Sequence, residues 1–360
     1  MSYFDNAATT YPKPDAVYSF MDSFYRNHGG SVGRGGYALA TTAKGLVDET
    51  RKLIQELMHC HAKQVIFTPT ATIALNMIIQ GAIVSGARSV YISPFEHNAV
   101  TRVLHHFEQL GQITVTELTV SESLEYDMVR IRYQFDAIRP DLVIVSHASN
   151  VIGLVAPVED IFALSKEYGA VTLVDMAQTA GLVDLNVGLE TVDYAVFAGH
   201  KTLLGPTGIS GFLMSPTVNL PPILYGGTGF DSANQNMPDS LPEKYEMGTL
   251  NIAGVAGLNA SLSPAMYADI GDYYENKTGY RMHSYLLSFF SLNFSVAQLF
   301  TGSIISICLG IVGFDKGAAV TPEMLTMFRN MVSLIPGIPL ALGAVASLFY
   351  PLSEKKMEQV

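Results

Sequence analysis

Short apolar runs alternate with longer amphipathic stretches over much of the chain. We predict strands at residues 64–68, 89–93, 113–118, 142–147, 171–175, 194–197 and 209–214. Most connections between these runs are long enough to hold a helix, which is typical of a mainly parallel sheet covered by helices on both faces. The pattern therefore predicts an α/β fold with seven strands. Ligands of such folds bind beyond the carboxyl ends of the strands.

Two helical stretches are predicted before the first strand. Between them lies the glycine-rich segment 27–36 (NHGGSVGRGG). On composition alone, such a segment is either a flexible loop or a loop with a function.

The pattern changes near residue 261. Residues 284–314 and 330–353 contain no Asp, Glu, Lys or Arg. A helix that spans a bilayer needs about 20 apolar residues, so both runs are long enough to be transmembrane helices. They could instead be buried core helices, although uncharged core helices of this length are rare. Pro336 and Pro339 favour the membrane, where proline inside a helix is better tolerated. We expect a lipid bilayer as a partner of this part.

Charge and cysteine content exclude some functions. The 360 residues are enough for about two domains, and the net charge of −11 argues against nucleic acid as a partner. Cys60 and Cys308 are the two cysteines, which is too few for a disulfide framework and favours a reducing compartment. The polar opening of the chain predicts no cleavable signal peptide.

One lysine lies where a strand end meets glycine-rich backbone. The predicted strand 194–197 leads into residues 197–208 (FAGHKTLLGPTG), which contain Lys201. Desolvation in such a setting lowers the pKa of a lysine and makes the amine a nucleophile that can form a Schiff base. A solvated surface lysine is the alternative, since this feature alone is common.

Three other stretches at predicted strand ends supply groups that suit a pyridoxal cofactor. Asp175 ends one strand and is able to keep a pyridine nitrogen protonated, with Gln178 three residues on. His97 offers a flat ring for stacking. Residues 68–72 (TPTAT) open a predicted helix, where hydroxyl and backbone N–H groups suit a phosphate. Together these features favour the Schiff-base interpretation of Lys201.

This order of motifs resembles the pyridoxal-phosphate enzymes of the class V aminotransferase group, and within it the cysteine desulfurase and selenocysteine lyase family. Residues 4–10 (FDNAATT) and 245–251 (YEMGTLN) fit the same family pattern. The resemblance implies a large domain of pyridoxal-phosphate fold type I with a seven-stranded sheet. It further implies pyridoxal 5′-phosphate as cofactor, a small amino acid such as cysteine as substrate, a homodimer, and a cytoplasmic location for this part. The glycine-rich segment 27–36 would then lie near the active site at the dimer interface.

The resemblance also assigns roles to residues. Lys201 would bind the cofactor covalently and move the α-proton of the substrate, and His97 would stack on the ring and act as an acid–base group. The remaining assignments are Asp175 to the ring nitrogen, Gln178 to the phenolic oxygen, Asn150 to the substrate, and Thr72, His200 and a dimer partner's Thr249 to the phosphate. No metal site is expected.

Two departures from the family pattern bear on activity. Ala198 replaces a hydroxyl residue two positions before the family histidine, so one phosphate contact is missing. The chain also leaves the family pattern at about residue 261, before the small domain that carries the persulfide-forming cysteine and the arginine that holds the substrate carboxylate. Cys60 is interpreted as a packing residue and Cys308 as a filler of a membrane helix. We therefore expect that desulfuration lacks its acceptor thiol.

The last part of the chain resembles a different family. Residues 265–281 and 349–356 resemble the end of glycoside–pentoside–hexuronide sugar–cation symporters, the melibiose-permease relatives. We therefore predict a desulfurase-like domain at 1–262 and a transporter-derived transmembrane hairpin at 263–360, joined as a chimaera. Two functions remain open: an enzyme that binds pyridoxal phosphate without full desulfurase activity, or a membrane-inserted fusion with a catalytically silent head.

Overall fold

The computed structural model of the chain describes residues 3–32, 37–229 and 233–263. Contacts divide the chain into two units between Ser263 and Pro264, and every described helix and strand belongs to the first unit. The two uncharged runs and the symporter-like stretches lie outside the described residues. No helix in the described ranges is both long and apolar enough to cross a membrane.

Seven strands form one sheet, as predicted, in the order β1-β7-β6-β5-β4-β2-β3. The strands are β1 (Gln64–Thr68), β2 (Ser89–Ile92), β3 (Thr114–Glu117), β4 (Leu142–Ser146), β5 (Val171–Asp175), β6 (Tyr194–Ala198) and β7 (Ser210–Met214). Each begins and ends within one residue of its predicted limits. The α/β class and the mainly parallel sheet are therefore confirmed.

β7 is the exception to the parallel arrangement. It pairs antiparallel with both β1 and β6, with Met214 opposite Gln64 on one side and Tyr194 on the other. The connection 199–209 contains no helix. A connection this short reverses the chain, whereas a parallel return needs a longer crossover.

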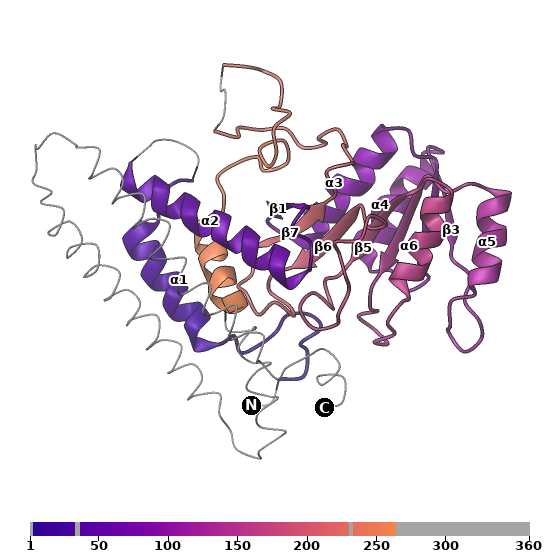
Figure 1. The fold of residues 1–360 in the computed structure, drawn as a ribbon, viewed down its shortest axis with the longest axis horizontal. Coiled ribbons are helices and arrows are strands. Elements are labelled where there is room, and N and C mark those ends of the chain that lie inside the picture. The colour runs from indigo at the N-terminus through magenta and orange to yellow at the C-terminus, as the bar shows by residue number, and fades with distance from the viewer. Residues whose placement is uncertain (1–2, 33–36, 230–232, 264–360) are drawn as a thin grey trace, which may run out of the picture. The chain divides into compact units, whose positions relative to one another are not determined.

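Helices cover both faces of the sheet (Figure 1). They are α1 (Asp15–His28), α2 (Ala38–Leu57), α3 (Ala71–Val84), α4 (Asn98–Gln109), α5 (Met128–Ala137) and α6 (Val158–Glu167), and residues 252–263 are also helical. Side chains of α2, α5 and α6 share one buried cluster with alternate strand residues, and those of α3 and α4 share the other. Both faces of the central strands are buried, which explains their unbroken apolar sequences.

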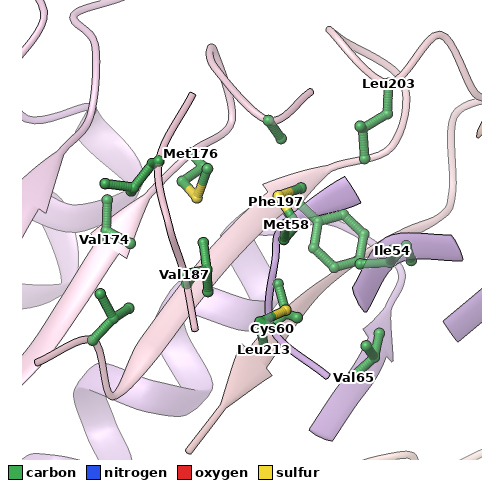
Figure 2. Close-up of a cluster of buried hydrophobic side chains, with 14 of the residues drawn as sticks. Ile54, Met58, Cys60, Val65, Val174, Met176, Val187, Phe197, Leu203 and Leu213 are labelled. Carbon is green, nitrogen blue, oxygen red and sulfur yellow. The ribbon is translucent and has the colours of Figure 1, made fainter. Parts of the chain in front are cut away.

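The cluster beneath α2 includes Phe197, Met58 and Cys60 (Figure 2). Phe197 is the next-to-last residue of β6, and its side chain is 0% exposed. Its ring lies against Gly211 of β7 and beside Ile54 of α2 (Figure 2). This ring therefore stabilises the strand that leads directly to Lys201.

We expect Phe197→Ala to lower the free energy of unfolding by about 3–5 kcal/mol, because it leaves a cavity in a fully packed core. Phe4→Ala is the matched control, since Phe4 is 92% exposed, and it should change stability by no more than about 0.5 kcal/mol. Urea unfolding followed by far-ultraviolet circular dichroism measures both variants. Equal stabilities for the two would contradict the packing assigned to Phe197.

Candidate active site

The carboxyl ends of β4, β5 and β6 meet at one edge of the sheet, and the candidate residues lie there. Ser146 ends β4, Asp175 ends β5 opposite it in register, and Ala198 ends β6 shortly before Lys201. Parallel neighbours must end at the same edge, so residues distant in the chain come together. Asp175 and Lys201 thus lie at or just beyond strand ends, as the sequence pattern predicts.

The turn that carries Lys201 is tight. The N–H of Lys201 donates to the carbonyl of Ala198, at 3.3 Å, and the N–H of Gly205 donates to the carbonyl of Gly199, at 2.8 Å. A Cβ on Gly199 would lie 2.5 Å from the carbonyl oxygen of Ile209, so this close approach requires glycine. Leu204 adopts a positive φ of 59°, an uncommon backbone conformation for a leucine. The backbone of this turn is thus held by its own bonds.

A strap at the amino terminus, defined as residues 5–13, also holds the Lys201 turn. Thr10 donates its hydroxyl to the carbonyl of Lys201 at 2.9 Å, and Thr9 donates to the carbonyl of His200 at 3.1 Å. The amine of Lys13 donates to the same His200 carbonyl. Thr9 further bonds the Nδ1 atom of His200, at 2.9 Å. The sequence analysis used 4–10 only as a family pattern and did not identify these contacts.

Asp175 is buried beside the lysine. Its side chain is 6% exposed, and Oδ1 accepts the N–H of Ala177 at 2.9 Å. Burial raises the pKa of Asp175, and the Ala177 hydrogen bond, Lys201 and His97 act in the opposite direction. Burial lowers the pKa of Lys201, opposed by the charge of Asp175. The structure thus brings Asp175, Lys201 and His97 into electrostatic contact.

His97 is held as the N-cap of α4. Its Nδ1 atom accepts the N–H of Ala99 at 3.1 Å. Because Nδ1 accepts this bond, the neutral ring carries its proton on Nε2. The cap therefore sets both the orientation of the ring and the nitrogen that remains available for proton transfer.

His200 lies on the Lys201 turn. Burial lowers the pKa of His200, with further contributions from the positive charges of Lys201 and Lys13. The ring is therefore held neutral at pH 7 and can act as a hydrogen-bonding group.

The other predicted residues are more dispersed. Gln178 donates its amide to the carbonyl of Ala7 at 2.9 Å, which ties it to the strap, and the side chain of Asn150 is exposed. Thr72 is exposed in the first turn of α3 and lines a groove of about 540 Å³ between α3 and α4. Thr249 lines a different cavity, of about 750 Å³, beside β1 and residues 208–209. Within one chain, Thr72 and Thr249 therefore do not share a pocket.

The donor set at this edge fits pyridoxal 5′-phosphate. Asp175 supplies a desolvated carboxyl for a ring nitrogen, and Lys201 supplies an amine whose pKa is lowered. The free N–H groups in the first turn of α3 suit an anion, and Thr70 caps that helix by accepting the N–H of Ile73 at 3.2 Å. Ala198 offers no hydroxyl to a phosphate.

Cys60 is not in an environment that makes a thiol reactive. It is 1% exposed, within the core cluster beneath α2 (Figure 2). Burial raises the pKa of Cys60 to about 12, and the nearby Lys63 offsets this only in part. A thiol in this state is on the order of 10⁻⁵ ionised at pH 7, so it is a poor nucleophile. Cys308 lies outside the described residues.

Known proteins resemble this chain over most of its length. A probable cysteine desulfurase of Methanothermobacter thermautotrophicus is 33% identical over 265 residues, covering 72% of this chain and 65% of that protein. One of Halalkalibacterium halodurans is 31% identical and covers 75% and 67%. The chain thus spans about two thirds of the length of these relatives.

Solved structures share the fold. The apo cysteine desulfurase of Thermococcus onnurineus matches with a TM-score of 0.67 at 28% identity, over 74% of this chain and 67% of that one. The S-sulfonic acid form of cysteine desulfurase CsdA from Escherichia coli matches with a TM-score of 0.61 at 28% identity, over 72% and 67%. SspA in complex with cysteine matches with a TM-score of 0.63 at 25% identity, over 73% and 72%.

The family profile described as aminotransferase class-V matches residues 2–311. This match continues past residue 262, where the sequence analysis places the end of the family resemblance. Nothing in the comparisons supports the sugar-symporter resemblance of the last part. The chain therefore belongs to the class V aminotransferase family of fold type I, and the cofactor is pyridoxal 5′-phosphate.

Proposed function

We propose that this chain is a cysteine desulfurase-like enzyme that binds pyridoxal 5′-phosphate through Lys201 and acts on small amino acids such as cysteine. The observation that carries the proposal is the buried carboxyl of Asp175 in electrostatic contact with Lys201 and His97. The cysteine desulfurases among its relatives and the cysteine complex of SspA support cysteine as the substrate. This chain covers 65% of the length of the Methanothermobacter relative and 72% of SspA.

Each residue at the strand ends has a distinct task in this proposal. Asp175 holds the ring nitrogen as a cation, which lets pyridoxal phosphate withdraw electrons from the α-carbon of the substrate. The Nζ atom of Lys201, whose pKa burial lowers, takes and returns the α-proton. The ring of His97 would stack on the cofactor, and its Nε2 atom would act as the second acid–base group.

Four further residues bind and orient. Gln178, fixed to the strap, binds the phenolic oxygen, and Asn150 faces the substrate. Thr72 and the neutral ring of His200 bind the phosphate. Thr249 completes the phosphate site from a partner subunit, which agrees with its place in a separate cavity within one chain.

Desulfuration needs one more group, a thiolate that attacks the sulfur of the substrate. Cys60 does not supply it, since its thiol is buried and its pKa is raised to about 12. Cys308 lies outside the described residues, in the uncharged run 284–314 that we predict to be a membrane helix, where ionisation of a thiol is disfavoured. We therefore propose that this chain alone binds the cofactor and moves the α-proton, but does not complete sulfur transfer.

The cofactor assignment is tested by trapping. After addition of pyridoxal phosphate and reduction with borohydride, peptide mapping should place the pyridoxyl label on Lys201, and Lys201→Ala should carry none. Lys13→Ala is the matched control, because burial also lowers the pKa of Lys13 and its amine reaches the same turn. A label on Lys13 would contradict the assignment. A protein that stays colourless with added cofactor would favour the catalytically silent head.

The sulfur-transfer limit is tested by measuring sulfide and alanine released from cysteine. We expect the reconstituted protein to release them no faster than Lys201→Ala, and Cys60→Ser to have no effect. The reason is the small ionised fraction of a thiol with a pKa of about 12. Turnover well above the Lys201→Ala control, lost in Cys60→Ser, would show that Cys60 is the acceptor.

The membrane prediction for residues 284–314 and 330–353 is independent of the enzyme site. Because both runs are long and uncharged, we expect the intact chain to remain in the membrane pellet during alkaline carbonate extraction. If the intact chain is recovered instead as a monodisperse species in the supernatant, the two runs are core helices.

A further inference from the structure

Glu96 precedes His97 and has no role in the site as described so far. Both of its carboxyl oxygens are bonded to Ser146. Oε1 accepts the N–H of Ser146 at 2.5 Å, and Oε2 is 2.7 Å from its hydroxyl. Ser146, at the end of β4, therefore contacts both carboxyl oxygens of Glu96, and the backbone of Ser93 also bonds this carboxyl.

The Glu96–Ser146 contact lies next to the candidate site. Ser146 ends β4 and lies opposite Asp175 in the register of β4 and β5. Glu96 therefore ties the loop that leads into α4 to the strand beside Asp175. His97 is the next residue in that loop, and its ring caps α4.

The surroundings of Glu96 disfavour a negative charge. No ion pair to Glu96 exists among residues 3–32, 37–229 and 233–263. Burial and the charge of Asp175 raise the pKa of Glu96 to about 8, although the hydrogen bonds from Ser146 and from the backbone of Ser93 act to lower it. Tyr126, which bonds Ser93 at 2.7 Å, is also in electrostatic contact with Glu96, and Lys201 and His97 are in electrostatic contact with Asp175.

We propose that Glu96 is a positioning residue that works as an uncharged acid, clamping the His97 loop to the end of β4 so that Asp175 is the single negative charge beside the ring nitrogen. In this form Oε1 accepts the Ser146 N–H, and the acid proton on Oε2 is donated to the Ser146 hydroxyl. A second carboxylate here would compete with Asp175 for the positive charges of Lys201 and the ring. The part that concerns the ring rests on the proposed function.

Glutamine is a close mimic of an uncharged glutamic acid. In Glu96→Gln, the amide oxygen accepts the Ser146 N–H and the amide nitrogen donates to the Ser146 hydroxyl, so both bonds survive. In Glu96→Ala, both bonds are lost and the Ser146 N–H is left without this partner. The two variants therefore separate the clamp from the charge.

The first experiment measures unfolding of the full-length chain without cofactor, as a function of pH. A group with a raised folded pKa keeps its proton in the folded state while the unfolded state releases it, so stability falls as pH rises between the two values. From about pH 5 to about pH 8, the unfolding constant of the wild type should rise relative to that of Glu96→Gln, by up to tenfold per pH unit. Glu49→Gln, which removes an exposed carboxyl, should run parallel to the wild type.

The second experiment measures binding of pyridoxal phosphate by absorbance titration. Glu96→Gln should bind within about threefold of the wild type, whereas Glu96→Ala should bind on the order of tenfold more weakly, because its His97 loop is no longer clamped. An infrared difference between the wild type and Glu96→Gln at pH 6 should show the C=O stretch of a protonated carboxyl.

Two results would overturn the proposal. One is parallel pH curves for Glu96→Gln and the wild type, which would mean that Glu96 is charged in the folded state. The other is cofactor binding by Glu96→Gln that is as weak as in Glu96→Ala. If the wild type binds no cofactor, the proposed function fails, and the unfolding and infrared measurements still decide whether Glu96 is an uncharged clamp.

Discussion

The carboxyl of Asp175, at the end of β5, is almost fully buried. Removing a charged carboxylate from water is costly, so this group needs hydrogen bonds and opposite charges around it. Among the described residues, the Asp175 carboxyl accepts a direct hydrogen bond from the N–H of Ala177, and Lys201 and His97 are in electrostatic contact with it. These groups come from three separate segments. They lie at or just after the ends of β5, β6 and β2, and only the shared carboxyl edge of these strands brings them together, so the sheet topology is what makes this electrostatic environment possible.

Burial favours the neutral forms of both Asp175 and Lys201, and it therefore shifts their pKa values in opposite directions. It raises the pKa of the acid and lowers that of the amine, and each charge partly restores the other. A lysine with this balance is a better nucleophile than a solvated lysine. In the proposed site, the carboxyl would in turn be stabilised by a cationic ring nitrogen beside it. Binding of the cofactor and ionisation of Asp175 are therefore thermodynamically linked.

Residues whose position depends on local pattern were predictable from the sequence. Asp175 and Lys201 follow buried strands, and the strand limits agree to within one residue because both faces of those strands are apolar. The antiparallel direction of β7 depends on the short link from β6 and was not part of the prediction. Glu96 and Lys13 were missed for a different reason. Their partners, Ser146 and His200, lie 50 and 187 residues away in the sequence, and no local pattern signals such contacts.

The strap of residues 5–13 has a consequence for biosynthesis. Its hydroxyl bonds to the Lys201 turn join positions 191 residues apart. Closing a loop of this length has an entropic cost that only a formed sheet can offset. A growing chain on the ribosome must therefore expose the turn with its carbonyls unpaired until β1 to β7 have emerged and assembled. The strap thus closes late, as a contact of high sequence separation that forms on a domain already assembled.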